Sequence, residues 1–90
     1  MTLTNSEKRD LKARAQRLEA VVKLGHSGMS EGFLQSLDAA LTQHGLVKMK
    51  FSDHKVEKKV LAPQMAERTG SALIMQVGHV AVFYRPKPEA

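Results

Sequence analysis

The segment Gly25-His26-Ser27-Gly28 is the part of this sequence best suited to bind a ligand. Glycine has no Cβ, so a Gly-X-X-Gly turn lets the backbone approach a ligand closely and adopt positive φ values. Ser30 can cap a following helix, whose first N–H groups and partial positive charge attract anions. A strand, loop and helix in this order are suited to hold a phosphate group.

The Gly-X-X-Gly motif has low specificity by itself. An ordinary turn between a strand and a helix is the more frequent explanation when only the motif is considered. The Gly-Lys-Ser/Thr of a nucleotide-binding P-loop is missing, and no third glycine completes a dinucleotide-binding fingerprint. His26 could hydrogen-bond a phosphate or stack on a base, or it could be a tolerated loop residue. The motif therefore needs support from the charge around it.

The charge balance provides that support. Lys and Arg number 14 against 9 Asp and Glu, which gives a net charge of +5 and a pI near 9.8. A basic domain attracts polyanions through its long-range field, although such a charge can also serve solubility alone. For a single lysine, a solvated surface position is the common explanation, so the prediction concerns a cluster around the loop. We expect that cluster to consist of Lys8, Lys12, Lys23 and Arg85.

Several kinds of chemistry are not indicated. The chain has no cysteine, which excludes disulfides and thiolate metal sites. Ser27 has no partnered base, the acids form no catalytic pair, and the histidines lack metal-ligand spacing. We expect no enzymatic activity, no catalytic residue, no cofactor, no metal and no small-molecule substrate. No apolar run is long enough for a signal peptide or a membrane span, so we expect a cytoplasmic protein without a membrane partner. The four histidines lie at separate element boundaries, at His26, His44, His54 and His79.

Hydrophobic periodicity predicts the elements that position the loop. Strands one and two, joined by a helix, should be parallel with a right-handed crossover, and the last two strands should form an antiparallel hairpin. Pro63 predicts a kink or a late start in the third helix. The fold class is α/β (α+β), with the order α-β-α-β-α-β-β and a mixed four-stranded sheet. The expected helices are residues 5–18, a helix capped by Ser30 and ending before Gly45, and 56–68; the expected strands are 21–24, 46–51, 73–77 and 80–84.

Aromatic residues are scarce, and three of the four have core positions. Phe33, Phe51 and Phe83 fall on apolar stripes, whereas Tyr84 beside Arg85 could be buried or exposed. Nothing resembles the aromatic stripes that stack on single-stranded bases. If the ligand is RNA, this scarcity favours contact with the phosphates and 2′-hydroxyls of folded RNA.

A spaced set of residues runs through nearly the whole chain. It consists of Leu3, Lys8, Leu11-Lys12, Ala15, Leu18, Val21-Val22, Leu24-Gly25-His26-Ser27-Gly28, Gly32, Glu67-Arg68-Thr69-Gly70 and Tyr84-Arg85-Pro86. The set is specific although no single motif in it is. It resembles a known family, the CRM or CRS1–YhbY domain, and most of all its stand-alone bacterial YhbY-type form.

The resemblance implies a fold similar to the C-terminal domain of bacterial translation initiation factor three. It implies RNA binding through the Gly-X-X-Gly loop and nearby basic residues, with roles for Gly25, Gly28, Lys8, Lys12 and Arg85. It also implies association with precursors of the large ribosomal subunit as an assembly factor. Because the loop interior varies in the family, it assigns no fixed role to His26 and Ser27.

Two hypotheses from different classes follow. The leading one is an RNA-binding domain over residues 1–86, with a loose tail over 87–90, that binds structured ribosomal RNA as a monomer. The alternative is a protein-interaction module that uses an open sheet face or an edge strand, with the basic charge incidental.

Overall fold

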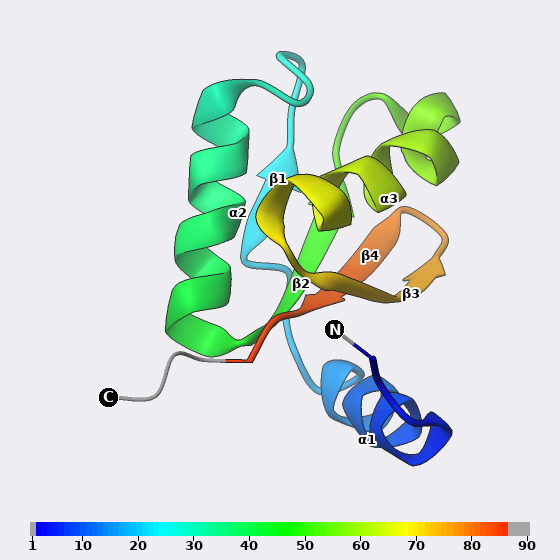
Figure 1. Cartoon of the computed structure of the whole chain (residues 1–90). Helices are drawn as coiled ribbons and strands as arrows, with labels where there is room; N and C mark the ends of the chain where they lie inside the picture. Colours follow the sequence, from blue (N-terminus) through cyan, green and yellow to red (C-terminus); the bar gives the residue numbers. More distant parts are fainter. Residues whose placement is uncertain (1, 87–90) are drawn as a thin grey trace.

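A four-stranded mixed sheet separates the helices into two layers (Figure 1). In this computed structural model the described residues are 2–86, so the predicted tail 87–90 lies outside them. Within this range, no helix is long and apolar enough to cross a membrane. The elements are α1 (Asn5–Ala15), β1 (Val22–Leu24), α2 (Glu31–His44), β2 (Leu46–Phe51), the 3-10 helix η1 (Lys55–Glu57), α3 (Lys58–Thr69), β3 (Ala72–Val77) and β4 (Val80–Tyr84).

The sheet has the strand order β1-β2-β4-β3, so β1 is an edge strand. β1 runs parallel to β2, with Leu24 beside Phe51, and β3 and β4 form an antiparallel hairpin. Both pairings and the mixed four-stranded sheet confirm the predicted fold class. Since parallel strands end at the same edge, the segments that follow β1 and β2 must be neighbours.

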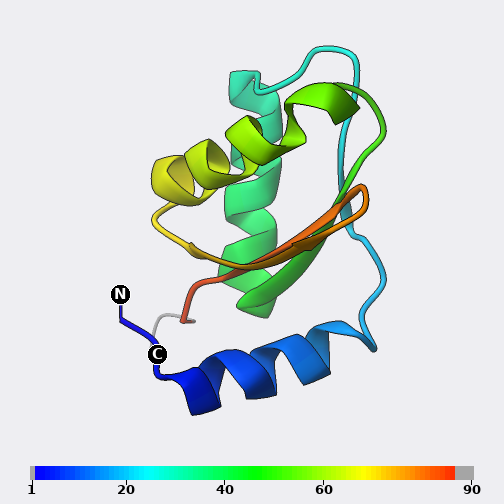
Figure 2. The same ribbon diagram turned by 90° about the vertical axis from the view of Figure 1, so that its right-hand side faces the viewer.

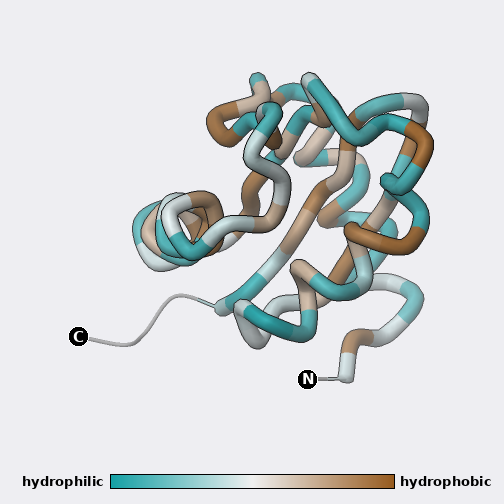
Figure 3. The backbone as a smooth tube through the Cα atoms, turned by 90° about the horizontal axis from the view of Figure 1, so that it is seen from above, coloured by the Kyte–Doolittle hydropathy of each residue, from teal (hydrophilic) through white to brown (hydrophobic). Residues whose placement is uncertain are grey.

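Helices α2 and α3 cover one face of the sheet. Along β1 and β2 the buried side chains of this core alternate with lysines. Figure 3 colours the backbone by hydropathy and shows hydrophobic and hydrophilic stretches interspersed along the chain. Phe51 and Phe83 are completely buried there, and Phe33 is buried beside them, so the predicted core role of the three phenylalanines is confirmed. They pack with Leu24, Leu37, Leu41, Met49 and Met65.

Helix α1 covers part of the opposite face, which the sequence had suggested would be open to water. Leu11 and Ala15 are buried against Leu46, Ile74 and Val82. Figure 2 shows the strands between α3 above and α1 below. Helices therefore cover both faces of the sheet at one end. At the other end, where β2 ends and β4 begins, they cover only one face.

Helices α1 and α3 differ in their bounds from the predictions. Helix α1 ends at Ala15 rather than Leu18, because the N–H groups of Arg17 and Leu18 bond to carbonyls three residues back and tighten the chain into a turn. Helix α3 spans Lys58–Thr69 rather than 56–68, and of the two alternatives for Pro63 the late start is wrong. Pro63 and Lys59 are both exposed, so water can hydrate the Lys59 carbonyl that loses its partner.

Candidate functional site

The loop of residues 25–28, called the GxxG loop below, leaves the carboxyl end of β1 and lies against the segment that follows β2. The Leu24 carbonyl accepts hydrogen bonds from the N–H groups of Ser52 (3.0 Å) and Asp53 (3.1 Å). These bonds tie the two segments together at one end of the sheet, beside the N-terminus of α2 (Figure 1).

The two glycines of the loop have different roles. Gly28 is buried with φ +66°, and a Cβ there would come 3.3 Å from His54 Nε2. Both the backbone conformation and the close ring favour glycine at this position. Gly25 is exposed, and a Cβ there would meet nothing within 4 Å. Gly28 thus serves the packing of the loop, whereas Gly25 leaves open space from which a ligand can approach the backbone.

His54 and Asp53 anchor the loop, and the sequence analysis did not single them out for this role. His54 Nε2 donates a hydrogen bond to the His26 carbonyl at 2.9 Å, and His54 itself has a left-handed φ of 55°. Asp53 Oδ2 lies 3.3 Å from His26 Nδ1. A signal was present in the sequence, because segments at the carboxyl ends of neighbouring parallel strands adjoin each other. That rule pairs residues 25–28 with 52–54.

The anchoring contacts shift two pKa values. The hydrogen bond to the His26 carbonyl raises the pKa of His54, and nearby Asp53 and Glu57 add to this against the opposing effect of desolvation. The N–H of His54 lowers the pKa of Asp53, with His26 contributing further. His54 Nδ1 lies 3.7 Å from Glu57 Oε1, so both ring nitrogens face acceptors and the charged ring is favoured.

Several backbone N–H groups at the loop point to no protein acceptor within residues 2–86. Ser30 caps α2 through a bond from the Phe33 N–H (3.2 Å), which leaves the N–H groups of Glu31 and Gly32 at the helix start. The N–H groups of His26 and Ser27 likewise have no acceptor among the described residues. Unpaired N–H groups and the helix dipole at the start of α2 are features that favour an anion.

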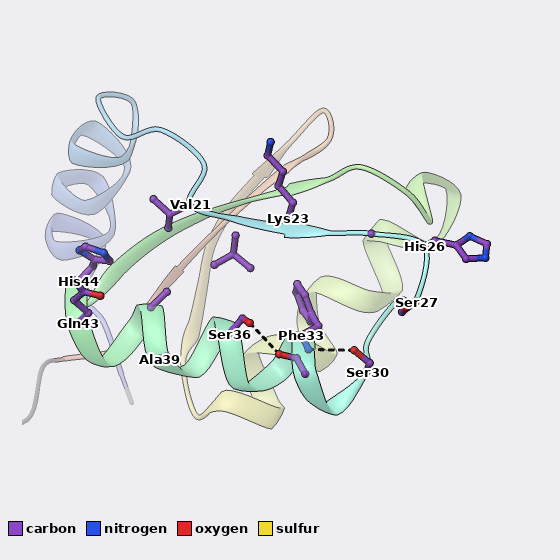
Figure 4. Close-up of a pocket in the computed structure, with 15 residues that line it drawn as sticks. Val21, Lys23, His26, Ser27, Ser30, Phe33, Ser36, Ala39, Gln43 and His44 are labelled. Atoms are coloured by element: carbon purple, nitrogen blue, oxygen red, sulfur yellow. Dashed lines mark hydrogen bonds between the residues drawn. The ribbon is translucent and has the colours of Figure 1, made fainter.

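A cleft of about 700 Å³ runs from the loop between β1 and α2 (Figure 4). Most of the α2 residues that line the cleft are small or polar, so large side chains do not fill it from this side. Ser36 donates its hydroxyl back to the Gly32 carbonyl at 3.0 Å. His26 points outward with its side chain 99% exposed, and Lys23 borders the cleft but points away from α2. The α2 residues that line it are Gly32, Phe33, Ser36, Ala39, Ala40, Gln43 and His44.

The predicted basic cluster is only partly assembled. Lys23 lines the cleft with Gly25, His26, Ser27 and Gly28. Lys8 and Lys12 are exposed on α1, which lies at the opposite end of the molecule from the loop (Figures 1 and 2). Their predicted role in binding stays a prediction, and only a ligand that extends well beyond the loop could reach them.

The guanidinium group of Arg85 is hydrogen-bonded to other residues of the protein. Its Nη1 bonds to Asp38 Oδ1 (2.6 Å) and to the Thr69 carbonyl (2.7 Å). Its Nη2 bonds to the Asp38 carbonyl (3.0 Å) and to Thr42 Oγ1 (2.8 Å). The side chain is 21% exposed. These contacts join the segment after β4 to α2 and to the end of α3, so Arg85 has a structural role and does not line the cleft.

The remaining acids and histidines of the described residues form no metal site. Among residues 2–86, no group of three or more His, Asp or Glu side chains could hold a metal ion. His44 lies at the far end of the cleft from His26, and His79 lies in the β3–β4 turn.

Comparison with known proteins shows similarity to one family over nearly the whole chain. The model of the CRS1 / YhbY (CRM) domain matches residues 3–85. A Haemophilus influenzae protein named RNA-binding protein is 37% identical over 90 residues, covering 99% of this chain and 91% of that protein. A Pseudomonas aeruginosa protein named as a probable RNA-binding protein is 29% identical, over 99% of this chain and 86% of that one.

A solved structure has the same fold. The solution structure of a Staphylococcus aureus protein, described as a candidate RNA-binding protein, aligns with a TM-score of 0.82 and 29% identity, covering 98% of this chain and 93% of that one. The sequence match and the shared arrangement of helices and strands agree with the resemblance inferred from the spaced residues. The chain belongs to the CRS1/YhbY (CRM) domain family.

Proposed function

We propose that this protein binds folded RNA through the GxxG loop. The observation that carries the proposal is the arrangement at the start of α2, where backbone donors without protein acceptors adjoin the open position of Gly25. A net charge of +5 draws a polyanion toward it. The names of the Haemophilus and Pseudomonas relatives support RNA as the ligand.

In this proposal the loop binds the sugar-phosphate backbone. A phosphate accepts hydrogen bonds from the N–H groups of residues 26 and 27 and at the helix start, while Gly25 allows close approach. His26 and Ser27, both exposed, add side-chain donors. Because Phe33, Phe51 and Phe83 are buried and Tyr84 is half-buried against the cluster under α1, the Phe and Tyr residues offer no exposed platform to splayed bases. Recognition by the shape of a folded RNA fits this inventory.

The family resemblance extends the proposal to ribosome assembly. The protein would act in the cytoplasm, as a monomer without enzymatic activity, on the ribosomal RNA of large-subunit precursors. The open cleft supports a long ligand rather than an enclosed small molecule, because metabolite sites bury most of their ligand.

A charge placed on the loop tests the proposed site. Gly25→Asp puts a carboxylate where the phosphate is expected, and the open space around Gly25 should leave the fold intact. Gln35→Glu is the matched control, because it adds the same charge on α2 outside the cleft. In fluorescence anisotropy with a ribosomal RNA fragment, Gly25→Asp should weaken binding by at least about tenfold, since opposed like charges cost several kcal/mol. Equal affinities for Gly25→Asp and Gln35→Glu would refute the role of the loop.

Sedimentation of cell extract, with sequencing of RNA crosslinked to the protein, tests the ribosomal assignment. We expect the protein in fractions of large-subunit precursors, crosslinked to their RNA. Protein at the top of the gradient that co-purifies with another protein after nuclease treatment would favour the interaction-module hypothesis instead.

A further inference from the structure

Two lysines stand side by side on the sheet face opposite α2 and α3. Lys23 of β1 and Lys50 of β2 are partners in the parallel register. Their neighbours along the strands, among them Leu24 and Phe51, are buried on the other face, so both lysines must point away from it. Figure 4 shows Lys23 pointing away from α2. Both residues are exposed.

The β3–β4 turn and the start of α3 bring more positive charge to the same end of the sheet. Lys58 Nζ donates to the Gly78 carbonyl at 2.5 Å and lies 3.4 Å from His79 Nδ1. The His79 carbonyl accepts from the Phe51 N–H at 2.7 Å, so the turn sits directly beside the end of β2. Desolvation lowers the pKa of His79, and the positive charges of Lys58, Lys55 and Lys50 lower it further. Lys58 thus contacts the turn, Lys50 pairs with Val80 directly after it, and Lys55 lies in the 3-10 helix just before Lys58.

The acids nearest to this group in the chain are engaged elsewhere. Asp53 contacts His26, and Glu57 contacts His54. Among residues 2–86, no ion pair involves Lys23, Lys50, Lys55 or Lys58. Like charges on neighbouring strands destabilise a sheet, so this arrangement does not serve folding.

Helix α1 leaves this end of the sheet uncovered. Its buried contacts are with Leu46 at the start of β2, Ile74 in the first half of β3 and Val82 in the middle of β4. Lys50 lies near the other end of β2, paired with Val80 at the start of β4. Lys23 and Lys50 thus lie on an accessible face that adjoins the segments carrying the GxxG loop and its His54 anchor.

We propose that Lys23, Lys50, Lys55 and Lys58, called the lysine surface below, form a second binding site for the phosphates of the RNA held at the GxxG loop. The inference rests on the proposed function and extends it around the end of the sheet. Lys23 precedes Gly25 by two residues, so a backbone leaving the loop passes this surface directly. Lysine binds phosphate as a flexible point charge, which suits recognition that depends on shape.

Removal of charge at this surface is the test. The double variant Lys50→Gln, Lys58→Gln is compared with Arg9→Gln, Lys59→Gln, which removes the same charge from exposed positions outside the surface. The probe is a fluorescein-labelled RNA stem-loop, titrated over a range of salt concentrations. Each lost phosphate contact should make the plot of log affinity against log salt concentration less steep by about 0.9. This is equivalent to about eightfold in affinity between roughly 1 M and 0.1 M salt. The control should keep the wild-type slope.

The single variant Lys50→Gln guards against a folding defect, since Lys58 also bonds to the Gly78 carbonyl. Equal slopes for wild type, control and both lysine variants would overturn the lysine surface while leaving the GxxG loop untouched. A wild type without affinity for RNA would overturn the proposed function itself, and this inference with it.

The ring of His79 supplies an independent readout. Phosphates bound beside it should offset the surrounding lysines, so its pKa should rise when the wild-type protein binds the stem-loop. An NMR titration of the His79 ring protons, with and without RNA, measures this directly. An unchanged pKa in the saturated complex would count against the lysine surface.

Discussion

The contrast between Gly28 and Gly25 leads to a sharp prediction about the loop. Gly28→Ala forces a side chain into φ +66°, a left-handed conformation that costs about 1–2 kcal/mol for an L-residue. The added Cβ would also lie 3.3 Å from His54 Nε2, the atom that bonds to the His26 carbonyl. We therefore expect Gly28→Ala to lower the free energy of unfolding by about 1–2 kcal/mol or somewhat more. Gly25→Ala meets nothing within 4 Å and should change it by less than about 0.5 kcal/mol.

Urea denaturation of both variants and the wild type measures these differences, with affinity for an RNA stem-loop determined on the folded proteins. Gly25→Ala should weaken RNA binding although its stability is unchanged, because its methyl group occupies the path of the ligand. A Gly25→Ala variant as unstable as Gly28→Ala would refute our division of roles between packing and ligand approach. The same would hold if Gly28→Ala were as stable as the wild type.

Two further predictions concern the anchors of the fold and the loop. Because the pKa of His54 is raised in the folded protein, the stability that its charged ring gives the loop is fully present below the ordinary pKa of 6.5 and is lost as pH rises through the folded pKa. RNA affinity measured across this range should fall with rising pH, and His54→Gln should reduce this fall. Arg85→Lys keeps the charge but loses the fork of bonds to Asp38 and Thr69, and should cost about 1.5–3 kcal/mol in the free energy of unfolding, measured by thermal denaturation. RNA affinity of the folded Arg85→Lys protein should be unchanged, and a selective loss of affinity would instead support the predicted RNA contact.

Local sequence rules were sufficient for the order of elements and for the sheet. Thr4 and Glu7 stand three residues apart, the spacing of a capping box, and they form one with bonds of 3.0 and 3.1 Å because both partners lie within one helical turn. The predicted bounds of β4 agree with the structure because Gly78 and His79 define the hairpin turn. Alternation along β2 is enough to assign Met49 and Phe51 to the core, since side-chain direction in a strand follows from position alone.

Hydrophobic periodicity was a weaker guide to which residues of α3 are buried. Val60 and Ala62 are both apolar, but Val60 is 62% exposed whereas Ala62 is completely buried. The helical period fits several apolar positions here, and the preceding turn at His54 and η1 decides which of them faces the sheet. The start of the helix depends on that turn, which no local motif specifies.

The sequence by itself determined that a glycine loop follows a strand and precedes a capped helix, in a basic chain. Only the tertiary structure decided which charged residues accompany the loop. In the folded protein Lys8 and Lys12 lie at the far end of the molecule, and Arg85 is hydrogen-bonded to other residues of the protein. His54 packs against Gly28, and the lysine surface lies beside the loop. The physical reason is that a helix or strand fixes the direction of its own side chains, whereas contacts between residues far apart in the chain depend on how the elements pack.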